Sequence, residues 1–392
     1  MSSTLSTEMI ESNTASSTTS STTSSTTSST TSSTELRTEL NNSVAATDSQ
    51  RMQAIHGWLG QISSPALQLA SLRPASADAS FRRYFRIDAD DGKSYIVMDA
   101  PQPAEDVRPF IRIAELFAQI NLTVPQVLAQ DTEQGFLLLT DLGTTTYFDA
   151  FKQNLGLDSV PDPQRAHPLY MDAIAALVQL QSQSQPDVLP EYDRAFLLRE
   201  LMIFPEWYLT KHRGATLTDE QSSSLQKVFD ALLANIVAQP QVYVHRDYHS
   251  RNLMLLEQGN PGILDFQGAL YGPLTYDLVS LLRDAYVLWD EDQVLDWAIR
   301  YWEQARRAGL PINPEFDSFY RDFEFMGLQR HLKILGIFAR LAHRDGKEAY
   351  LNDIPLVMSY VRKTAQRYNI LIPLLRLLDV LEDTAPVVGF TF

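Results

Sequence analysis

Two carboxylates and one amide near the middle of the chain have the types and spacing that phosphoryl transfer requires. Asp247 and Asn252 are five residues apart in the segment VHRDYHSRN at 244–252, and Asp265 lies thirteen residues after Asn252. Phosphoryl transfer to an alcohol needs a carboxylate beside the acceptor hydroxyl, and it needs oxygen ligands for the Mg²⁺ that holds the nucleotide phosphates. The sequence therefore predicts that Asp247 is the catalytic residue and that Asn252 and Asp265 bind Mg²⁺.

The segments around these residues are expected to form a loop followed by a short hairpin. Apolar residues at 242–244 are typical of a buried strand that leads into the loop. Strands at 253–256 and 262–264, joined by a turn at 257–261, would then return the chain so that Asp265 faces the loop. An isolated H-x-D triplet usually indicates only a capped turn. A structural loop remains the alternative, but the complete constellation favours a catalytic loop.

The catalytic segment also resembles that of a known family. In the aminoglycoside phosphotransferase and choline kinase superfamily this loop reads H-G-D-x-H-x-x-N, and the metal motif reads I-D-x-D or L-D-F. The chain departs from this pattern at Arg246, where the superfamily has Gly. Other motifs resemble the bacterial kinases that phosphorylate the anomeric hydroxyl of N-acetylmuramate or N-acetylglucosamine in cell-wall recycling, and this resemblance covers about residues 55–360. Those motifs are ASFRRYFR at 79–86, YIVMDAP at 95–101, FPEWY at 204–208, LDFQ at 264–267, YGPLTYDL at 271–278 and QRHLK at 329–333.

The resemblance implies an α/β (α+β) two-lobed protein-kinase-like fold, with a small strand-rich N-lobe and a larger, mostly helical C-lobe. We accordingly expect residues 1–50 to form a disordered tail, residues 51–140 a nucleotide-binding N-lobe, and residues 141–392 a C-lobe with the catalytic loop and the acceptor-sugar pocket. The implied activity is ATP-dependent phosphorylation of the anomeric hydroxyl of N-acetylmuramate, N-acetylglucosamine or both, in peptidoglycan recycling, with ATP and Mg²⁺ as cofactors.

The residues by themselves indicate the reaction type, whereas the sugar and the anomeric position come only from the resemblance. Two alternatives therefore stay open. One is a related kinase acting on an aminoglycoside, choline or a homoserine-like alcohol, and the other is a nucleotide-binding pseudokinase. The intact set of Asp247, Asn252 and Asp265 disfavours the pseudokinase.

The composition of the chain limits its partners and its surroundings. Residues 16–34 are only Ser and Thr, which cannot form a core, and the start of the chain lacks the basic and apolar stretches of a secretion signal. The absence of cysteine excludes disulfides and thiolate metal sites, and no apolar run has the length of a membrane span. A formal net charge of −16 makes nucleic acid and anionic membranes poor partners. We expect a cytoplasmic monomer whose partner is a small amino-sugar substrate.

The N-lobe is expected to begin with an amphipathic helix that carries Met52, Ile55 and Leu59 on one face. After it, periodicity and turn residues predict strands at 81–87, 94–98, 125–128 and 136–139, and a helix at 105–120.

Two N-lobe segments are candidates for nucleotide binding. Thr140, Asp141 and Leu142 follow the last predicted strand, and we expect them to form a hinge whose backbone binds adenine. A turn of small residues before the first strand would bring backbone N–H groups close to phosphate, with Ser80 and Arg83 as further donors. That turn has no glycine, so it is not a G-x-G-x-x-G loop, and an ordinary hairpin entry is the alternative.

Met98 lies where protein kinases carry the lysine that pairs with the nucleotide phosphates. Compensating positive charge could come from Arg82 or Arg83, and the sequence does not choose between them. Without that lysine the usual Lys–Glu pair is in doubt, and Glu115 is assigned to the surface.

Two groups of residues are predicted to bind the acceptor sugar. Glu206 and Trp207 place a carboxylate beside an aromatic ring, which suits sugar hydroxyls and a sugar face, while a core cluster at a helix start is the alternative. Arg283, Arg330 and His331 are basic residues in an acidic chain and are candidates to bind a lactyl carboxylate, while a solvated helix face is the alternative.

Three further residues are predicted to support the catalytic loop. His245 and His249 belong to the loop itself, and we expect His249 to be a buried histidine that orients it. Asp277 opens a predicted helix and is expected both to cap that helix and to brace the loop from beneath.

Overall fold

The computed structural model describes residues 48–76, 82–101, 103, 105–152 and 162–382. The chain divides into two compact units, residues 1–61 and 62–392. In the first unit residues 48–59 form a helix with Ile55 and Leu59 buried, which confirms the predicted opening helix. The helix begins at residue 48, two residues before the expected end of the tail at residue 50. No helix in the described part of the chain is both long and apolar enough to cross a membrane.

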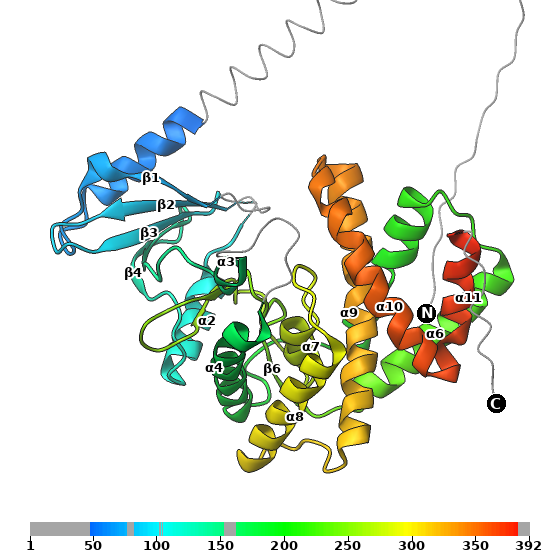
Figure 1. Ribbon diagram of the computed structural model, residues 1–392. Helices are drawn as coiled ribbons and strands as arrows, with labels where there is room; N and C mark the ends of the chain where they lie inside the picture. The colour runs from blue at the N-terminus through cyan, green and yellow to red at the C-terminus, as the bar shows by residue number, and fades with distance from the viewer. Residues whose placement is uncertain (1–47, 77–81, 102, 104, 153–161, 383–392) are drawn as a thin grey trace, which may run out of the picture. The chain divides into compact units, whose positions relative to one another are not determined.

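A five-stranded antiparallel sheet forms the first part of the second unit, in the order β1-β2-β3-β5-β4 (Figure 1). The strands are β1 Arg73–Ser76, β2 Arg83–Asp88, β3 Ser94–Asp99, β4 Val127–Asp131 and β5 Phe136–Thr140. The sequence predicted all of them except β1. Its segment RPAS contains a proline and no β-branched or aromatic residue, which is a composition that only an edge strand tolerates.

Helix α2, Arg108–Gln119, follows β3 in the chain and packs against the segment that carries Asp265. Its buried face includes Phe110 and Phe117, whose rings lie 4.8 and 5.7 Å from the ring of Phe266. The predicted helix is confirmed, with a start three residues later than expected. These aromatic contacts position the residue next to the predicted metal ligand.

Two short strand pairs flank the predicted catalytic loop. Strand β6, Gln241–Val244, pairs with β9, Leu270–Pro273, and ends where the loop begins. Strand β7, Leu253–Met254, follows the loop and pairs with β8, Gly262–Ile263. The predicted strand, loop and hairpin are confirmed, although β7 and β8 are shorter than expected.

Helices make up most of the remaining described chain (Figure 1). They are α3 Tyr147–Lys152, α4 Pro163–Ser182, α5 Arg194–Leu201, α6 Asp219–Val237, α7 Tyr276–Leu282, α8 Glu291–Arg307, α9 Phe316–Asp345, α10 Ile354–Arg367 and α11 Ile372–Leu381, with a π-helix η2 at Phe204–His212 and 3-10 turns at Leu69–Ser71, Glu348–Asp353 and Asn369–Leu371.

Helix α9 is the longest of these and is buried along much of its length. Gly336 lies directly against the backbone of Ile203, where an added Cβ would come within 2.5 Å of the carbonyl oxygen. This close approach packs α9 against the chain that enters η2. As a result α9 carries buried polar residues, including Arg330 and Lys333, into the interior beside the catalytic loop.

Candidate functional site

Asp277 braces the catalytic loop through two backbone hydrogen bonds. Its buried carboxylate accepts the backbone N–H of His245 at 2.6 Å and that of Arg246 at 2.9 Å. Burial raises the pKa of this carboxyl to about 7, against the lowering effect of the two N–H donors. The expected helix cap is wrong, because α7 begins at Tyr276 and the Asp277 carboxylate is turned to the loop instead.

Arg246 adopts a left-handed backbone conformation, with φ of 79°. This conformation suits glycine, which has no Cβ, and is unfavourable for other residues. The Arg246 guanidinium lies 2.5 Å from the buried carboxylate of Glu200, and it also lies over the rings of Phe196 and Tyr192. These side-chain contacts offset the backbone strain at a position where the superfamily pattern has glycine.

The carboxylate of Asp247 is ionised and partly accessible. Its side chain is 46% exposed, and a guanidinium nitrogen of Arg330 lies 3.9 Å from Oδ1. Burial opposes ionisation, but the positive charges of Arg330 and Lys333 outweigh it and hold the pKa of Asp247 at about 2. At neutral pH this side chain therefore accepts hydrogen bonds and can orient an approaching hydroxyl.

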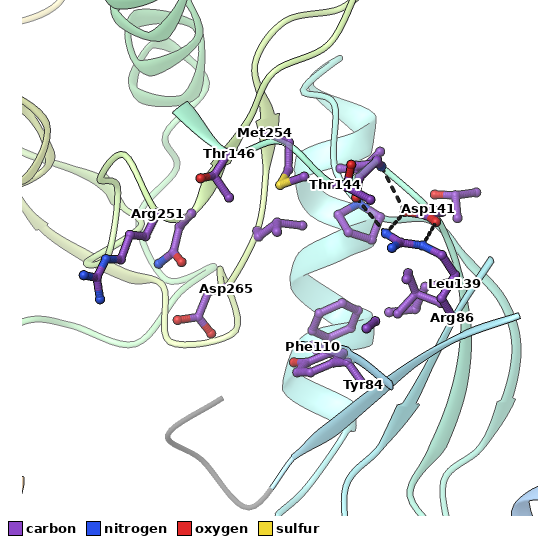
Figure 2. Close-up of a pocket in the computed structure, with 18 residues that line it drawn as sticks. Tyr84, Arg86, Phe110, Leu139, Asp141, Thr144, Thr146, Arg251, Met254 and Asp265 are labelled. Atoms are coloured by element: carbon purple, nitrogen blue, oxygen red, sulfur yellow. Dashed lines mark hydrogen bonds and ion pairs between the residues drawn. The ribbon is translucent and has the colours of Figure 1, made fainter. Parts of the chain in front are cut away.

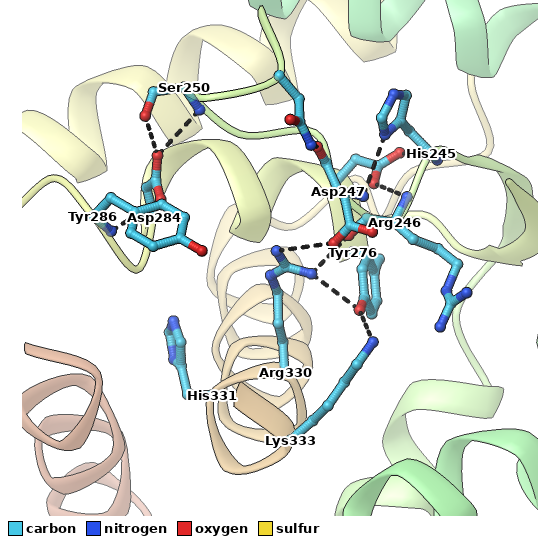
Figure 3. Close-up of polar contacts among 12 residues, drawn as sticks. His245, Arg246, Asp247, Ser250, Tyr276, Asp284, Tyr286, Arg330, His331 and Lys333 are labelled. Carbon is cyan, nitrogen blue, oxygen red and sulfur yellow. Dashed lines mark hydrogen bonds and ion pairs between the residues drawn. The ribbon is translucent and has the colours of Figure 1, made fainter. Parts of the chain in front are cut away.

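A buried network lies behind this carboxylate (Figure 3). Arg330 donates to the carbonyl oxygen of Arg246 at 2.7 Å and to the hydroxyl of Tyr276 at 3.0 Å. Lys333 donates to the same hydroxyl at 3.1 Å and lies 2.9 Å from Glu200. The sequence suggested Arg330 as a substrate ligand. In the structure Arg330 instead binds the backbone of the catalytic loop and favours the ionised form of Asp247.

Asn252 and Asp265 line one cavity and offer oxygen atoms to a cation. The side-chain N–H of Asn252 donates to the carbonyl of Asp247 at 3.0 Å, which leaves its amide oxygen for a metal. Asp265 is 39% exposed and has a left-handed φ of 62°. Such oxygens fit Mg²⁺. No group of three His, Cys, Asp or Glu is arranged to hold a metal in the described part of the chain.

Histidines in the loop are neutral and connect it to its surroundings. The Nδ1 of His245 accepts the N–H of Asp247 at 3.2 Å, so its Nε2 donates to the carbonyl of Leu264 at 2.9 Å. Burial lowers the pKa of His245 to about 4. Burial also lowers the pKa of His249, whose ring packs edge-on against Tyr286 at 5.5 Å. Both histidines therefore act on the shape of the loop.

A cavity of about 370 Å³ lies between the sheet and the catalytic loop (Figure 2). Apolar side chains that suit a flat heterocycle form much of its lining, namely Tyr84, Ile96, Phe110, Leu139, Met254 and Leu264. Every predicted hinge residue and both predicted metal ligands line the same cavity. The tertiary structure thus brings these two parts of the predicted site together.

In the predicted hinge, the carboxylate of Asp141 is already bonded within the protein, so the backbone is the part that a nucleotide could contact. Asp141 is bound by Arg86 at 2.5 and 3.0 Å and by the N–H of Gly143 at 2.9 Å. Burial raises the pKa of Asp141, but these donors outweigh it and lower the value. The N–H of Thr140 already bonds a neighbouring carbonyl. Among the described residues, the N–H of Leu142 has no acceptor and is available to an adenine.

Of the two arginines that could replace the missing lysine, Arg82 lies nearer to the predicted metal site. Its guanidinium is 3.0 Å from Glu105 and 3.9 Å from the carboxylate of Asp265. Arg83 lies instead 2.6 Å from the fully buried carboxylate of Asp99. The structure therefore favours Arg82 as the source of positive charge for the phosphates.

Met98 is buried in the core, where an unpaired lysine would be costly. Glu115 is exposed, as expected. Ser80, the other predicted phosphate donor, lies outside the described residues.

The predicted acceptor residues Glu206 and Trp207 lie on η2. Glu206 is exposed and Trp207 is partly buried. The rings of Phe204 and Tyr208, in the same segment, are buried and stack 5.5 Å apart. The alternative of a core cluster thus describes Phe204 and Tyr208, while the other two side chains remain accessible to a ligand.

Arg283 and His331 are engaged inside the fold. Arg283 is buried and lies 2.8 Å from Glu291 and 3.2 Å from Glu324. The Nε2 of His331 contacts the carbonyl of Arg283 at 3.0 Å, and burial lowers the pKa of this histidine to about 3. Neither residue lies on a solvated helix face. Because both side chains are buried and held by contacts inside the fold, we leave both out of the proposed sugar site.

Asp284 and Glu200 support the loop but were not predicted from the sequence. The buried Asp284 carboxylate accepts the hydroxyl of Ser250 at 2.5 Å and its N–H at 3.1 Å, which holds the middle of the loop (Figure 3). Glu200 forms an ion pair with the guanidinium of Arg246. A buried acid needs a partner, but these partners come from distant segments, so no local pattern marks either residue.

The chain is similar to known proteins over most of its length. The chain matches the phosphotransferase enzyme family over residues 71–312. It is 52% identical over 320 residues to an N-acetylmuramate/N-acetylglucosamine kinase of Neisseria meningitidis, covering 81% of this chain and 93% of the relative. A kinase of the same name from Pseudomonas aeruginosa is 46% identical over 330 residues, covering 82% and 94%.

A solved structure shows the same fold. An amicoumacin kinase in complex with AMP-PNP and Ca²⁺ aligns with a TM-score of 0.52 at 16% identity, over 78% of this chain and 91% of that chain. The expected two-lobed kinase-like fold, with a strand-rich N-lobe and a mostly helical C-lobe, is confirmed.

Proposed function

Because the chain belongs to the phosphotransferase enzyme family, we propose that it is an ATP-dependent kinase that phosphorylates the anomeric hydroxyl of N-acetylmuramate, N-acetylglucosamine or both. The observation that carries the reaction type is the ionised Asp247 on the loop whose Asn252 lines a cavity with Asp265. The sugars are supported by the names of relatives at 52% and 46% identity. The product would be a sugar 1-phosphate in peptidoglycan recycling.

The nucleotide would occupy the 370 Å³ cavity. Its adenine would lie among the apolar side chains and accept the N–H of Leu142. Asn252 and Asp265 would hold Mg²⁺, which supplies charge neutralisation on the phosphates. Arg82, 3.9 Å from Asp265, would add a positive charge where the buried Met98 replaces the usual lysine.

Asp247 would orient the acceptor hydroxyl. Its low pKa makes it a weak base, but the anomeric hydroxyl of a free sugar is more acidic than an ordinary alcohol. A positioned carboxylate therefore suffices for this acceptor. Most of the rate would come from alignment and from electrostatic stabilisation of the transferring phosphoryl group. Glu206 and Trp207, accessible on η2, would contribute to the sugar site.

The anomeric assignment is tested with N-acetylglucosamine and its 1-O-methyl glycoside. The glycoside keeps every other hydroxyl but cannot accept phosphate at C1, so we expect turnover only of the free sugar. Phosphorus NMR of the product should show a phosphate coupled to the anomeric proton. Turnover of the glycoside, or a phosphate on C6, would disprove the anomeric position and leave only a general sugar kinase.

A further inference from the structure

A guanidinium beside the proposed catalytic centre has no ionic partner in the part of the chain that the structure describes. Arg251 directly precedes Asn252 and lines the cavity. Of the arginines in that lining, Arg86 is paired with Asp141, whereas Arg251 forms no ion pair or hydrogen bond with any described residue. In a chain of net charge −16, an unpaired cation at this position is available to an anionic ligand.

Aromatic rings hold Arg251 in place. Its guanidinium carbon lies 3.5 Å from the ring centroid of Tyr286 and 4.7 Å from that of Phe148. Tyr286 is itself anchored, because its N–H donates to Asp284, the residue that also binds Ser250 of the catalytic loop. Stacking fixes the plane of a guanidinium while leaving its edge N–H donors unused, which is the preparation that bidentate binding of a carboxylate needs.

A second cation shares this neighbourhood. The ammonium of Lys152 lies 4.1 Å from the ring centroid of Phe148, the same ring that Arg251 contacts. Burial raises the pKa of Asp353, and the charges of Arg251 and Lys152 act in the opposite direction on it. Neither cation forms an ion pair with Asp353 or with another acid among the described residues. Both cations therefore lack a direct ion pair in the described part of the chain, and the nearest acids, Asp353 and Asp284, act on this region only through space.

The position of Arg251 separates it from the adenine end of the cavity. Figure 2 shows the side chain of Arg251 directed away from the hinge residues Asp141 and Arg86. The other basic candidates for an anionic acceptor, Arg283 and Arg330, are buried and already paired. Arg251 is thus the guanidinium best placed to meet an acid on the acceptor.

We propose that Arg251 binds the lactyl carboxylate of N-acetylmuramate and thereby makes the enzyme discriminate between its two sugars. This inference rests on the proposed function, since the two sugars differ chiefly in that lactyl group. Two parallel N–H donors of a guanidinium fit the two oxygens of a carboxylate. Their interaction is strongest where the guanidinium is already held in place, because less conformational freedom is lost on binding. Lys152 adds a second positive charge nearby.

The test compares three acceptors with the intact enzyme and with the variant Arg251→Gln. The acceptors are N-acetylmuramate, its uncharged methyl ester and N-acetylglucosamine. In the wild type, kcat/KM for the acid should exceed that for the ester. In Arg251→Gln the acid-to-ester ratio and the acid-to-N-acetylglucosamine ratio should each fall about tenfold or more, while the KM for ATP stays the same. Arg251→Lys should give intermediate ratios, because it keeps the charge but loses the fork.

Arg307→Gln is the matched control, because Arg307 is exposed on α8 and paired only with Glu303. It should leave both ratios unchanged. Equal loss for all three acceptors, or a raised KM for ATP with unchanged ratios, would show that Arg251 serves the nucleotide or the fold and would overturn the inference. A wild type that uses the sugars but treats acid and ester alike would also overturn it while sparing the proposed function. Failure on all three acceptors would overturn both.

Discussion

The two acids predicted to act at the reaction centre differ in what each should contribute. Asp247 has a low pKa and is proposed to orient the acceptor, whereas Asp265 lines the cavity proposed for the nucleotide and is predicted to bind Mg²⁺. Asp247→Asn should lower kcat by about 10² or more, which is the usual scale for a positioned base, and should barely change nucleotide affinity. Asp265→Ala should weaken binding of the Mg²⁺–nucleotide complex. Steady-state kinetics and calorimetry measure the two effects, and equal, mild losses in both variants would contradict these roles.

Arg330 should control the pH dependence of activity through Asp247. The pKa of Asp247 is about 2, below the ordinary value of about 3.9, so the carboxylate stays ionised above about pH 4. Its ionisation therefore contributes stability that is present above the ordinary pKa and is lost as the pH falls toward 2. Arg330→Gln removes the positive charge that lowers the pKa of Asp247 most. Burial of Asp247 remains, and it raises that pKa.

The Arg330→Gln variant should accordingly lose kcat/KM as the pH falls from 7 toward 5, while the wild type stays flat over that range. The profile should be measured at saturating Mg²⁺–ATP, with Arg307→Gln as the control for loss of an exposed arginine. A variant with lower activity but the wild-type pH profile would mean that Arg330 only holds the loop backbone.

At the scale of the elements, the catalytic loop combines a strained backbone with side-chain supports from three helices. Arg246 has a left-handed φ, and its partners come from elsewhere, with Glu200 on α5, Asp277 on α7 and Arg330 on α9. The loop therefore depends for its shape on packed helices as well as on its own side chains. This arrangement leaves the carboxylate of Asp247 accessible while the backbone behind it is fixed.

A matched pair of variants separates the backbone strain from the side-chain contacts. Arg246→Ala and Arg246→Gly both lose the Glu200 pair, but only alanine keeps a Cβ at a φ of 79°. Left-handed backbone costs a residue with a Cβ about 1–2 kcal/mol, and the extra freedom of glycine in the unfolded chain cancels part of this difference.

Arg246→Ala should thus be about 1 kcal/mol less stable than Arg246→Gly in urea unfolding. Both should be less stable than the wild type, because the buried Glu200 then keeps only Lys333 as a charged partner among the described residues. Equal stability of the two variants would show that the loop relaxes away from the left-handed conformation.

At the scale of the molecule, the Ser/Thr tract is expected to lie outside the catalytic machinery. Residues 16–34 offer no apolar side chain to a core, and the described helix begins at residue 48. Deleting residues 1–47 should leave kcat, KM and the melting temperature essentially unchanged. Kinetics and thermal unfolding of the truncated chain measure this directly, and a large loss of activity would mean that the tail binds the catalytic unit.

The sequence by itself determined the chemistry, because that chemistry is local. The spacing of Asp247, Asn252 and Asp265 is a property of one loop and one hairpin, and short apolar runs predict the strands around them. For the same reason four of the five sheet strands and α2 were predictable. The edge strand β1 was not, since its stability comes from pairing with β2 rather than from its own residues.

The tertiary structure decided which charges are available, because ion pairs form between segments far apart in the chain. Neighbouring residues in an extended chain point to opposite sides, so only the fold could show that Arg82 lies near Asp265 while Arg83 reaches the buried Asp99. Similarly, the sequence made Arg283 and Arg330 candidates for an anionic substrate, and packing of α7 and α9 paired both inside the protein. What remains unpaired at such a site depends on every long-range contact around it, and no local pattern encodes those contacts.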